Sequence, residues 1–172
     1  MQNPVLLERV SLSLVAHKHA PALLAILTQP QVAQYNDYAL PLSREEVKQM
    51  IQNDLSSYYN QAGLRLAISN NLDDCLMGSV GFYDINDAQA WLGFELSHQY
   101  WNQGYMYEVL INLINKQGYT NWLENPIATI FARVAAANCK SIQLLTKIGF
   151  QQVDDDTWRF AIKTCGAGSF NS

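Results

Sequence analysis

The residues with the clearest chemical potential lie in the segment from Leu96 to Glu108. It joins an apolar strand to an amphipathic helix through a polar turn that contains one glycine, Gly104. The first amides of a helix have no intrahelical acceptor and carry the positive end of the helix dipole, so they bind phosphate groups well. A glycine there permits a close backbone approach. The spacing G-x-x-x-x-G-K is absent, which excludes a nucleoside triphosphatase loop. Taken alone, the segment also fits an ordinary strand–helix turn.

A second segment makes the pattern specific. Residues 101–108 read W-N-Q-G-Y-M-Y-E, and residues 138–150 follow the pattern N-x-x-S-x-x-x-x-x-K-x-G-F. The first resembles the acetyl-CoA pyrophosphate loop of GNAT acetyltransferases, and is closest to the branch of the ribosomal-protein alanine acetyltransferases. The second resembles another signature of that branch, and Glu8-Arg9-Val10-x-Leu12 resembles its first strand. The similarity extends from about residue 7 to residue 153.

The resemblance implies that acetyl-CoA is bound as a co-substrate, without a metal. The backbone amides expected to wrap its pyrophosphate are those of Gln103, Gly104, Tyr105, Met106 and Tyr107. The family usually has Gly or Ala at the position of Met106 and often Thr at the position of Tyr107, so these larger side chains are expected to reshape or weaken binding.

The same resemblance places the pantetheine arm beside the strand edge near Phe94, Leu96 and Ser97, where two adjacent strands of the family's sheet splay apart and an extended group can pair like an added strand. Asn138 would contact the coenzyme near its thioester, and it also fits the N-cap of a short helix. Both roles are compatible.

Acetyl transfer to an amine requires a proton acceptor, polarisation of the thioester carbonyl and a proton donor for the thiolate. The Leu96 amide is expected to polarise the carbonyl. Many GNAT enzymes use a tyrosine as the acid, but Leu145 stands at that position, and Ser141 is the best candidate for the donor. The alternative for Ser141 is a helix-start hydroxyl that bonds its own backbone.

Three residues are candidates for the base. Glu95 interrupts an apolar strand beside the expected thioester, where a carboxylate could accept a proton, through water or directly; an outward-facing strand position is equally compatible. His98 has a suitable intrinsic pKa but lies at a strand end, where solvent-facing histidines are common. Glu108 lies in the first turn of a helix, where a negative charge is favourable in any case. Glu95 is the preferred candidate.

The acceptor pocket is expected among the helices before the second strand. That region contains aromatic side chains and a carboxylate suited to a cationic amine: Tyr35, Asp37, Tyr38, Tyr58 and Tyr59. The acidic run 154–156 could attract an amine at the rim, although tyrosines also serve ordinary packing.

Composition limits the other functions. The chain has 172 residues, 49% hydrophobic and 15% charged, with a net charge of −4, which suits a globular protein and disfavours nucleic acid as a partner. Three widely spaced cysteines argue against a disulfide framework or a zinc site, and no apolar run is long enough to span a membrane. These features predict a cytoplasmic protein. The resemblance implies that it acts on a small-molecule or peptide amine, and a homodimer is one expected assembly.

The hydrophobic periodicity predicts the element order β, α, α, β, β, β, α, β, α, β, β. This is an α/β (α+β) fold: a single domain over residues 1–165 with a mixed, mostly antiparallel sheet of six to seven strands and helices on both faces, followed by a flexible tail at 166–172. A capping box at Ser43-Arg44-Glu45-Glu46 marks one helix start, a long helix is expected over 104–118, and Gly149 is expected to end the last helix.

Three functional hypotheses follow. The first is an N-acetyltransferase in which a primary amine attacks acetyl-CoA directly in a ternary complex. The second is a GNAT-fold module that binds CoA or acyl-CoA without catalysis, suggested by Leu145, Met106 and Tyr107. The third is an interaction domain that has lost the coenzyme, which side chains filling the diphosphate space would indicate. The first is preferred, and because a fold alone does not fix function, the other two are retained as alternatives.

Overall fold

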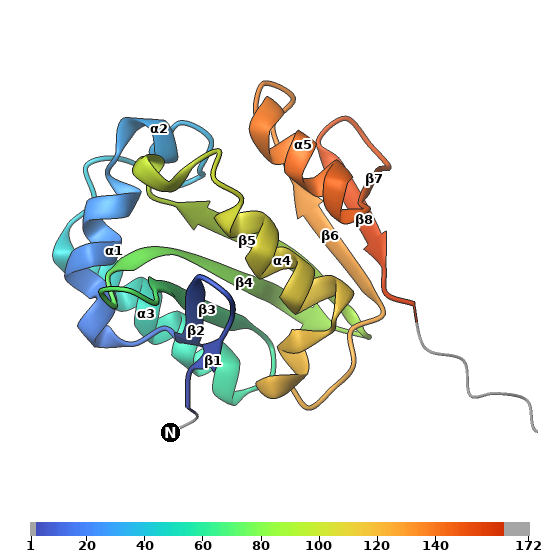
Figure 1. The fold of residues 1–172 in the computed structure, drawn as a ribbon, viewed down its shortest axis with the longest axis horizontal. Coiled ribbons are helices and arrows are strands. Elements are labelled where there is room, and N and C mark those ends of the chain that lie inside the picture. The colour runs from blue at the N-terminus through green and yellow to red at the C-terminus, as the bar shows by residue number, and fades with distance from the viewer. Residues whose placement is uncertain (1–2, 164–172) are drawn as a thin grey trace, which may run out of the picture.

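One twisted sheet organises residues 3–163, the part of the chain that the computed structural model describes (Figure 1). The strand order is β1-β2-β3-β4-β5-β6-β8-β7, and every pairing is antiparallel except that of β5 with β6. The strands are β1 (Val5–Leu6), β2 (Val10–Leu14), β3 (Leu64–Asn70), β4 (Leu76–Asn86), β5 (Gln89–Leu96), β6 (Thr129–Arg133), β7 (Gln151–Gln152) and β8 (Thr157–Ala161).

The predicted mixed, mostly antiparallel fold is confirmed, but the sheet has eight strands rather than six or seven. The additional strand is β1, which has two residues and pairs with β2 through Val5 opposite Leu12. A two-residue strand is too short to show hydrophobic alternation, so the sequence gives no sign of it. The tail predicted at 166–172 lies outside the described residues.

The helices are α1 (Ala20–Leu27), α2 (Pro30–Ala33), α3 (Arg44–Tyr59), α4 (Tyr105–Leu110) and α5 (Cys139–Ile148). The predicted capping box at the start of α3 is present, because the Ser43 hydroxyl accepts from the Glu46 amide at 3.1 Å and the Glu46 carboxylate accepts from the Ser43 amide at 2.7 Å. At the end of α5, Gly149 adopts a left-handed φ of 116°, as the C-cap prediction requires.

The helix predicted over 104–118 is shorter and less regular than expected. It is α-helical only to Leu110, continues as a π-helical turn over Ile111–Asn115, and is followed by Gln117 at a φ of 55°. The chain then folds back so closely that a Cβ on Gly118 would lie 2.4 Å from Oδ1 of Asn112. The hydrophobic periodicity of a sequence does not indicate such a reversal of the backbone, so the predicted helix was too long.

Two hydrophobic cores lie on opposite faces of the sheet. The larger packs α4 and α5 against the sheet and includes Leu66, Leu92 and Leu145, whereas the smaller is formed with α1 and α3 and includes Leu23 and Ile51. Successive residues of a strand point to opposite faces, so β3 and β5 contribute alternate side chains to the two sides. Helices therefore cover both faces, as predicted.

The feature that positions the site is a split between two neighbouring strands. The parallel pairing of β5 with β6 ends at Leu92 opposite Ala132, although β5 continues to Leu96 in its pairing with β4. The carboxyl ends of β5 and β6 therefore separate, and α4 and α5 follow these two strands in the chain. The helix starts that the sequence singles out are thereby brought to one end of the sheet (Figure 1).

Candidate active site

A cavity of about 620 Å³ opens where β5 and β6 separate. Its walls come from the end of β5, the start of α4, the end of β6, the start of α5 and the segment around α2. Most of the predicted site residues line it: Glu95, Leu96, Gly104, Tyr105, Met106, Tyr107, Asn138 and Ser141. Tertiary structure thus gathers the two sequence signatures, which lie about 30 residues apart, around one space.

The start of α4 offers free main-chain donors to this cavity. Gly104 is the N-cap residue and has a left-handed φ of 79°, a conformation that glycine adopts without steric cost. No side chain of the described residues caps this helix start. Because the first helical amides have no acceptor within the helix, they remain available to an anion.

Arg9 and Glu108 brace the loop that carries this helix start. The Glu108 carboxylate accepts from the Arg9 amide at 2.9 Å and from Arg9 Nε at 2.7 Å. Arg9 Nη1 also donates to the Gln103 carbonyl at 2.8 Å, and its guanidinium lies 4.3 Å from the centre of the Tyr105 ring. Glu108 therefore has the structural role that its position in the first helical turn suggested.

Two lysines near the helix start had no predicted role. Lys140 lines the cavity with its ammonium 4.9 Å from the centre of the Trp101 ring, and the Lys147 ammonium lies 4.2 Å from the centre of the Tyr107 ring. Both belong to α5, and Lys147 is the lysine of the second signature. The available signal was their spacing of seven residues, which places both on one side of a helix.

The end of β5 is fixed by bonds on both sides. The Leu96 carbonyl accepts from Trp101 Nε1 at 2.6 Å, while the Ser97 amide donates to the Met77 carbonyl at 2.8 Å. The Ser97 hydroxyl is buried and accepts from Gln29 Nε2 at 3.0 Å. The structure thus places Ser97 against the segment between α1 and α2, and Ser97 is not among the cavity-lining residues.

The two departures from the family pattern leave the cavity open. Met106 is 7% exposed and packs into the larger core, and Tyr107 is a partly buried neighbour of that core. Both contribute to the cavity wall, yet about 620 Å³ of space remains. Met106 and Tyr107 therefore line the cavity without filling it, in contrast to what a lost coenzyme site would show. Gln103 is not a lining residue, and its side-chain amide donates to the Gln99 carbonyl.

On α5, Asn138 and Ser141 face the cavity and Leu145 does not. Asn138 Oδ1 accepts from the Ser141 amide at 3.3 Å, so Asn138 caps the helix while it lines the cavity. The Ser141 hydroxyl forms no hydrogen bond within residues 3–163 and is half-buried. Leu145, at the position of the family's acid, is fully buried in the core.

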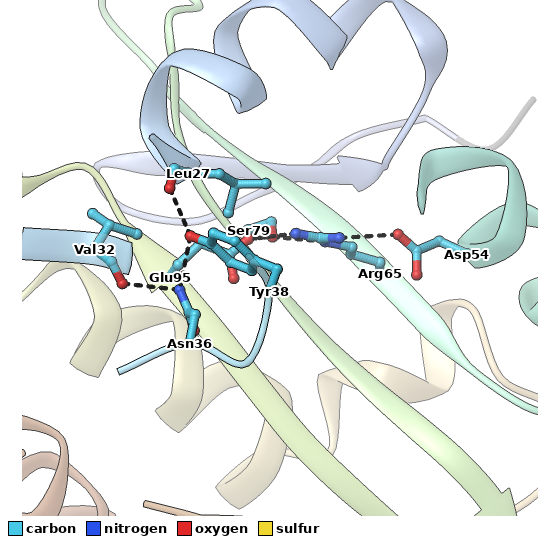
Figure 2. Close-up of polar contacts among 8 residues, drawn as sticks. All are labelled: Leu27, Val32, Asn36, Tyr38, Asp54, Arg65, Ser79 and Glu95. Carbon is cyan, nitrogen blue, oxygen red and sulfur yellow. Dashed lines mark hydrogen bonds and ion pairs between the residues drawn. The ribbon is translucent and has the colours of Figure 1, made fainter. Parts of the chain in front are cut away.

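Glu95 lines the cavity and belongs to a polar network that is largely buried (Figure 2). Arg65 Nη2 donates to Glu95 Oε1 at 2.6 Å, Arg65 Nη1 donates to Asp54 Oδ2 at 3.1 Å, and the Ser79 hydroxyl also bonds Glu95 Oε1. The side chain of Glu95 is 14% exposed. Both contacts use the same oxygen, so Glu95 Oε2 is left without a hydrogen bond to the described residues.

The network carries two carboxylates and one guanidinium. Burial alone disfavours the Arg65 cation, but Glu95 and Asp54 outweigh this effect and raise the pKa of Arg65. Burial raises the pKa of Asp54 even though Arg65 opposes the shift. Burial also raises the pKa of Tyr38, whose hydroxyl donates to the Leu27 carbonyl at 2.7 Å and accepts from Asn36 Nδ2 at 3.1 Å (Figure 2).

The residues expected to form the acceptor pocket are only partly brought together. Tyr35 lines the cavity, and its hydroxyl donates to the Ala137 carbonyl at 3.2 Å, which joins the α2 segment to the start of α5. Asp37, Tyr38, Tyr58, Tyr59 and residues 154–156 are not among the lining residues, and neither is His98. Tyr58 and Tyr59 lie at the end of α3, which leads into the first residues of β3 rather than to the split between strands. Sequence proximity did not predict which tyrosine faces the cavity.

Comparison with known proteins agrees with this geometry. Residues 9–151 match the family described as the acetyltransferase (GNAT) domain. The chain belongs to the GNAT acetyltransferase family. This confirms the predicted family and the acyltransferase class.

Two curated relatives are similar over most of their length. The uncharacterized N-acetyltransferase p20 of Bacillus licheniformis is 30% identical over 149 residues, which cover 84% of this chain and 80% of the relative. The uncharacterized N-acetyltransferase YoaA of Bacillus subtilis (strain 168) is 26% identical over 147 residues, which cover 84% and 81%. Among solved structures, the ribosomal L7/L12 protein acetyltransferase RimL in complex with coenzyme A has the same GNAT fold, with a TM-score of 0.79, 17% identity and coverage of 93% of this chain and 98% of that one.

The remaining findings limit other site types. In residues 3–163 no group of three or more His, Cys, Asp or Glu side chains is arranged to hold a metal ion. Within the same range, no helix has the length and apolar character needed to cross a membrane.

Proposed function

We propose that this GNAT protein transfers an acetyl group from acetyl-CoA to a primary amine, by direct attack in a ternary complex. The supporting observation is the cavity at the β5–β6 split. It is lined by the start of α4, which has no side-chain cap, by Asn138, and by Ser141, whose hydroxyl has no partner in the described chain. The structure of RimL in complex with coenzyme A, which shares the fold, supports the same ligand.

The coenzyme fits this space by its chemistry. Diphosphate oxygens require donors, and the first amides of α4 supply them next to the Arg9, Lys140 and Lys147 cations. The pantetheine arm is an extended amide chain, and the unpaired end of β5 near Phe94 and Leu96 offers backbone groups to it. When bound, acetyl-CoA supplies an activated acyl group as a thioester.

Glu95 is the residue proposed to accept the proton of the ammonium. Arg65 and Ser79 hold Oε1, which fixes the carboxylate, and Oε2 has no hydrogen-bond partner among the described residues and retains its capacity to accept a proton. With Asp54, the network has one more negative than positive charge, which favours a cationic acceptor. A positioned base of this kind typically increases the rate of the chemical step by a factor of about 10²–10⁴.

Ser141 is proposed to donate a proton to the departing thiolate, because its hydroxyl lines the cavity and has no other partner in the described chain. Leu145 cannot serve, since its side chain is apolar and fully buried. The Leu96 amide is proposed to polarise the acyl oxygen, which requires only the exposed edge of β5.

Two measurements test the proposal. Titration calorimetry with CoA should show saturable binding, and incubation with acetyl-CoA and a panel of primary amines should release free thiol. Absence of CoA binding at millimolar concentration would overturn the assignment. Tight CoA binding without transfer to any amine would instead support the alternative, a coenzyme-binding module without catalysis.

A further inference from the structure

A row of aromatic side chains crosses the sheet on the face that carries Glu95. Tyr83 of β4 lies opposite Trp91 of β5, and Trp91 lies opposite Phe131 of β6, so the three are direct cross-strand neighbours. The Tyr83 and Trp91 rings are stacked with centres 6.4 Å apart and planes 23° apart, and the Trp91 and Phe131 ring centres are 5.3 Å apart. We call these three residues the aromatic row.

The aromatic row is not part of the packing that stabilises the fold. None of its members belongs to either hydrophobic core or to the partly buried residues packed against the cores of the described chain. Tyr83 is 45% exposed, and Trp91 and Phe131 are each partly exposed. On this face α3 packs on β3 and α1 packs on β4. Large aromatic rings stacked in the open are typical of a surface that binds a partner.

The aromatic row is continuous with the cavity. Trp91, Gly93 and Glu95 are alternate residues of β5 and therefore point to the same face. A Cβ on Gly93 would lie 3.6 Å from the Tyr83 ring, so this ring extends along the strand beside Gly93, between Trp91 and Glu95. Arg133 connects the two regions, since it lines the cavity while its guanidinium lies 5.1 Å from the centre of the Trp91 ring.

The charges around the row suit an amine that carries an apolar group. Burial raises the pKa of the Tyr83 hydroxyl; the Arg133 cation opposes this shift, and the negative charges of Asp84 and Asp37 add to it. Glu95 lines the cavity, whereas the aromatic row offers ring faces. An ammonium is thus favoured at one end and a flat apolar group at the other.

We infer that the acceptor is a primary amine bearing an aromatic group that stacks on Tyr83 and Trp91, with its ammonium directed toward Glu95. The inference rests on the proposed function and specifies its acceptor. Because β5 rises about 3.3 Å per residue, the aromatic group should lie roughly 7–13 Å from the reacting nitrogen. A peptide with an aromatic residue near its N-terminus has this spacing.

Transfer to matched acceptors tests the inference. The tripeptide amides Ala-Ala-Trp and Ala-Ala-Ala differ only in the aromatic group, and tryptamine carries that group closer to its amine. The wild-type protein should acetylate Ala-Ala-Trp with kcat/KM roughly 3- to 10-fold above Ala-Ala-Ala, the range expected from one aromatic pair. Trp91→Ala should abolish the preference, Trp91→Phe should retain part of it, and Tyr59→Ala should leave it unchanged because Tyr59 is 76% exposed and does not line the cavity. A preference for tryptamine over both peptides would assign the same aromatic chemistry to a small amine.

A binding readout separates this inference from the proposed function. Saturation-transfer NMR on Ala-Ala-Trp amide, with CoA-saturated protein, should show signal on the indole protons that Trp91→Ala removes and Tyr59→Ala preserves. If Trp91→Ala does not fold, Tyr83→Ala serves instead, since Tyr83 is the most exposed member of the row.

Equal kcat/KM for both peptides, in a protein that binds CoA and acetylates them, would overturn this inference and leave the proposed function intact. A Trp91→Ala variant that changes the mass measured by light scattering but keeps the acceptor preference would also overturn it, because the row would then be a self-association face.

Discussion

Replacing Glu95 by glutamine tests its proposed role as proton acceptor separately from its role in the hydrogen-bond network. Glutamine keeps an oxygen for the Arg65 and Ser79 hydrogen bonds, which all converge on Oε1, but it cannot accept a proton at the other end. Asp54→Asn is the matched control, because Asp54 contacts the same guanidinium at 3.1 Å and is not among the cavity-lining residues.

The structure predicts similar stability losses for the two variants and different rates. Each substitution converts a hydrogen bond to a charged group into one to a neutral group, which costs about 1 kcal/mol of unfolding free energy, while the other carboxylate still balances Arg65. Loss of a positioned base should lower kcat by about 10²–10⁴ in Glu95→Gln. Asp54→Asn should stay within about threefold of wild type, since the residue lies outside the cavity.

The assay is thiol release at saturating acetyl-CoA and amine, paired with urea unfolding of each variant to confirm that the loss in rate is not a loss of folded protein. CoA affinity should be unchanged in both variants, because the coenzyme is proposed to bind main-chain groups of α4 and β5, which neither substitution removes. The reasoning is refuted if Glu95→Gln retains kcat within threefold of wild type. Equal rate losses in both variants would show that the charge of the network, rather than the Glu95 carboxylate, determines the rate.

Three further outcomes are expected. Gly104→Ala should weaken CoA binding measured by calorimetry, because a side chain at a φ of 79° costs about 1–2 kcal/mol and relief of that strain moves the amides of the helix start. Ser141→Ala should lower kcat by about tenfold or more at unchanged CoA affinity; an unchanged kcat would exclude the hydroxyl as the proton donor. Burial lowers the pKa of His19, whose Nδ1 accepts from the Ala16 amide, so the folded state favours the neutral ring. This stabilisation is present above about pH 6.5 and is lost as the pH falls, so the unfolding free energy should decrease more between pH 7.5 and 5.5 in wild type than in His19→Gln.

Local patterns in the sequence were sufficient for most elements of the fold. The capping box at Ser43 and the C-cap at Gly149 depend on bonds between residues a few positions apart, so the chain encodes them locally. Strand β1 and the irregular end of the helix after Leu110 were missed, because a two-residue strand exists only through its pairing with β2 and a π-helical turn has no hydrophobic period of its own.

The sequence by itself also determined the family and indicated the candidate residues of the coenzyme loop, because a helix start that can bind phosphate is a property of a short segment and its glycine. Only the tertiary structure decided how Glu95 is held and which aromatic side chains lie side by side. Arg65, Ser79 and Glu95 stand on three different strands, and Tyr83, Trp91 and Phe131 become neighbours only through the registers of β4, β5 and β6. Strand register is set by the packing of the whole sheet, so contacts that depend on it cannot be read from any one segment.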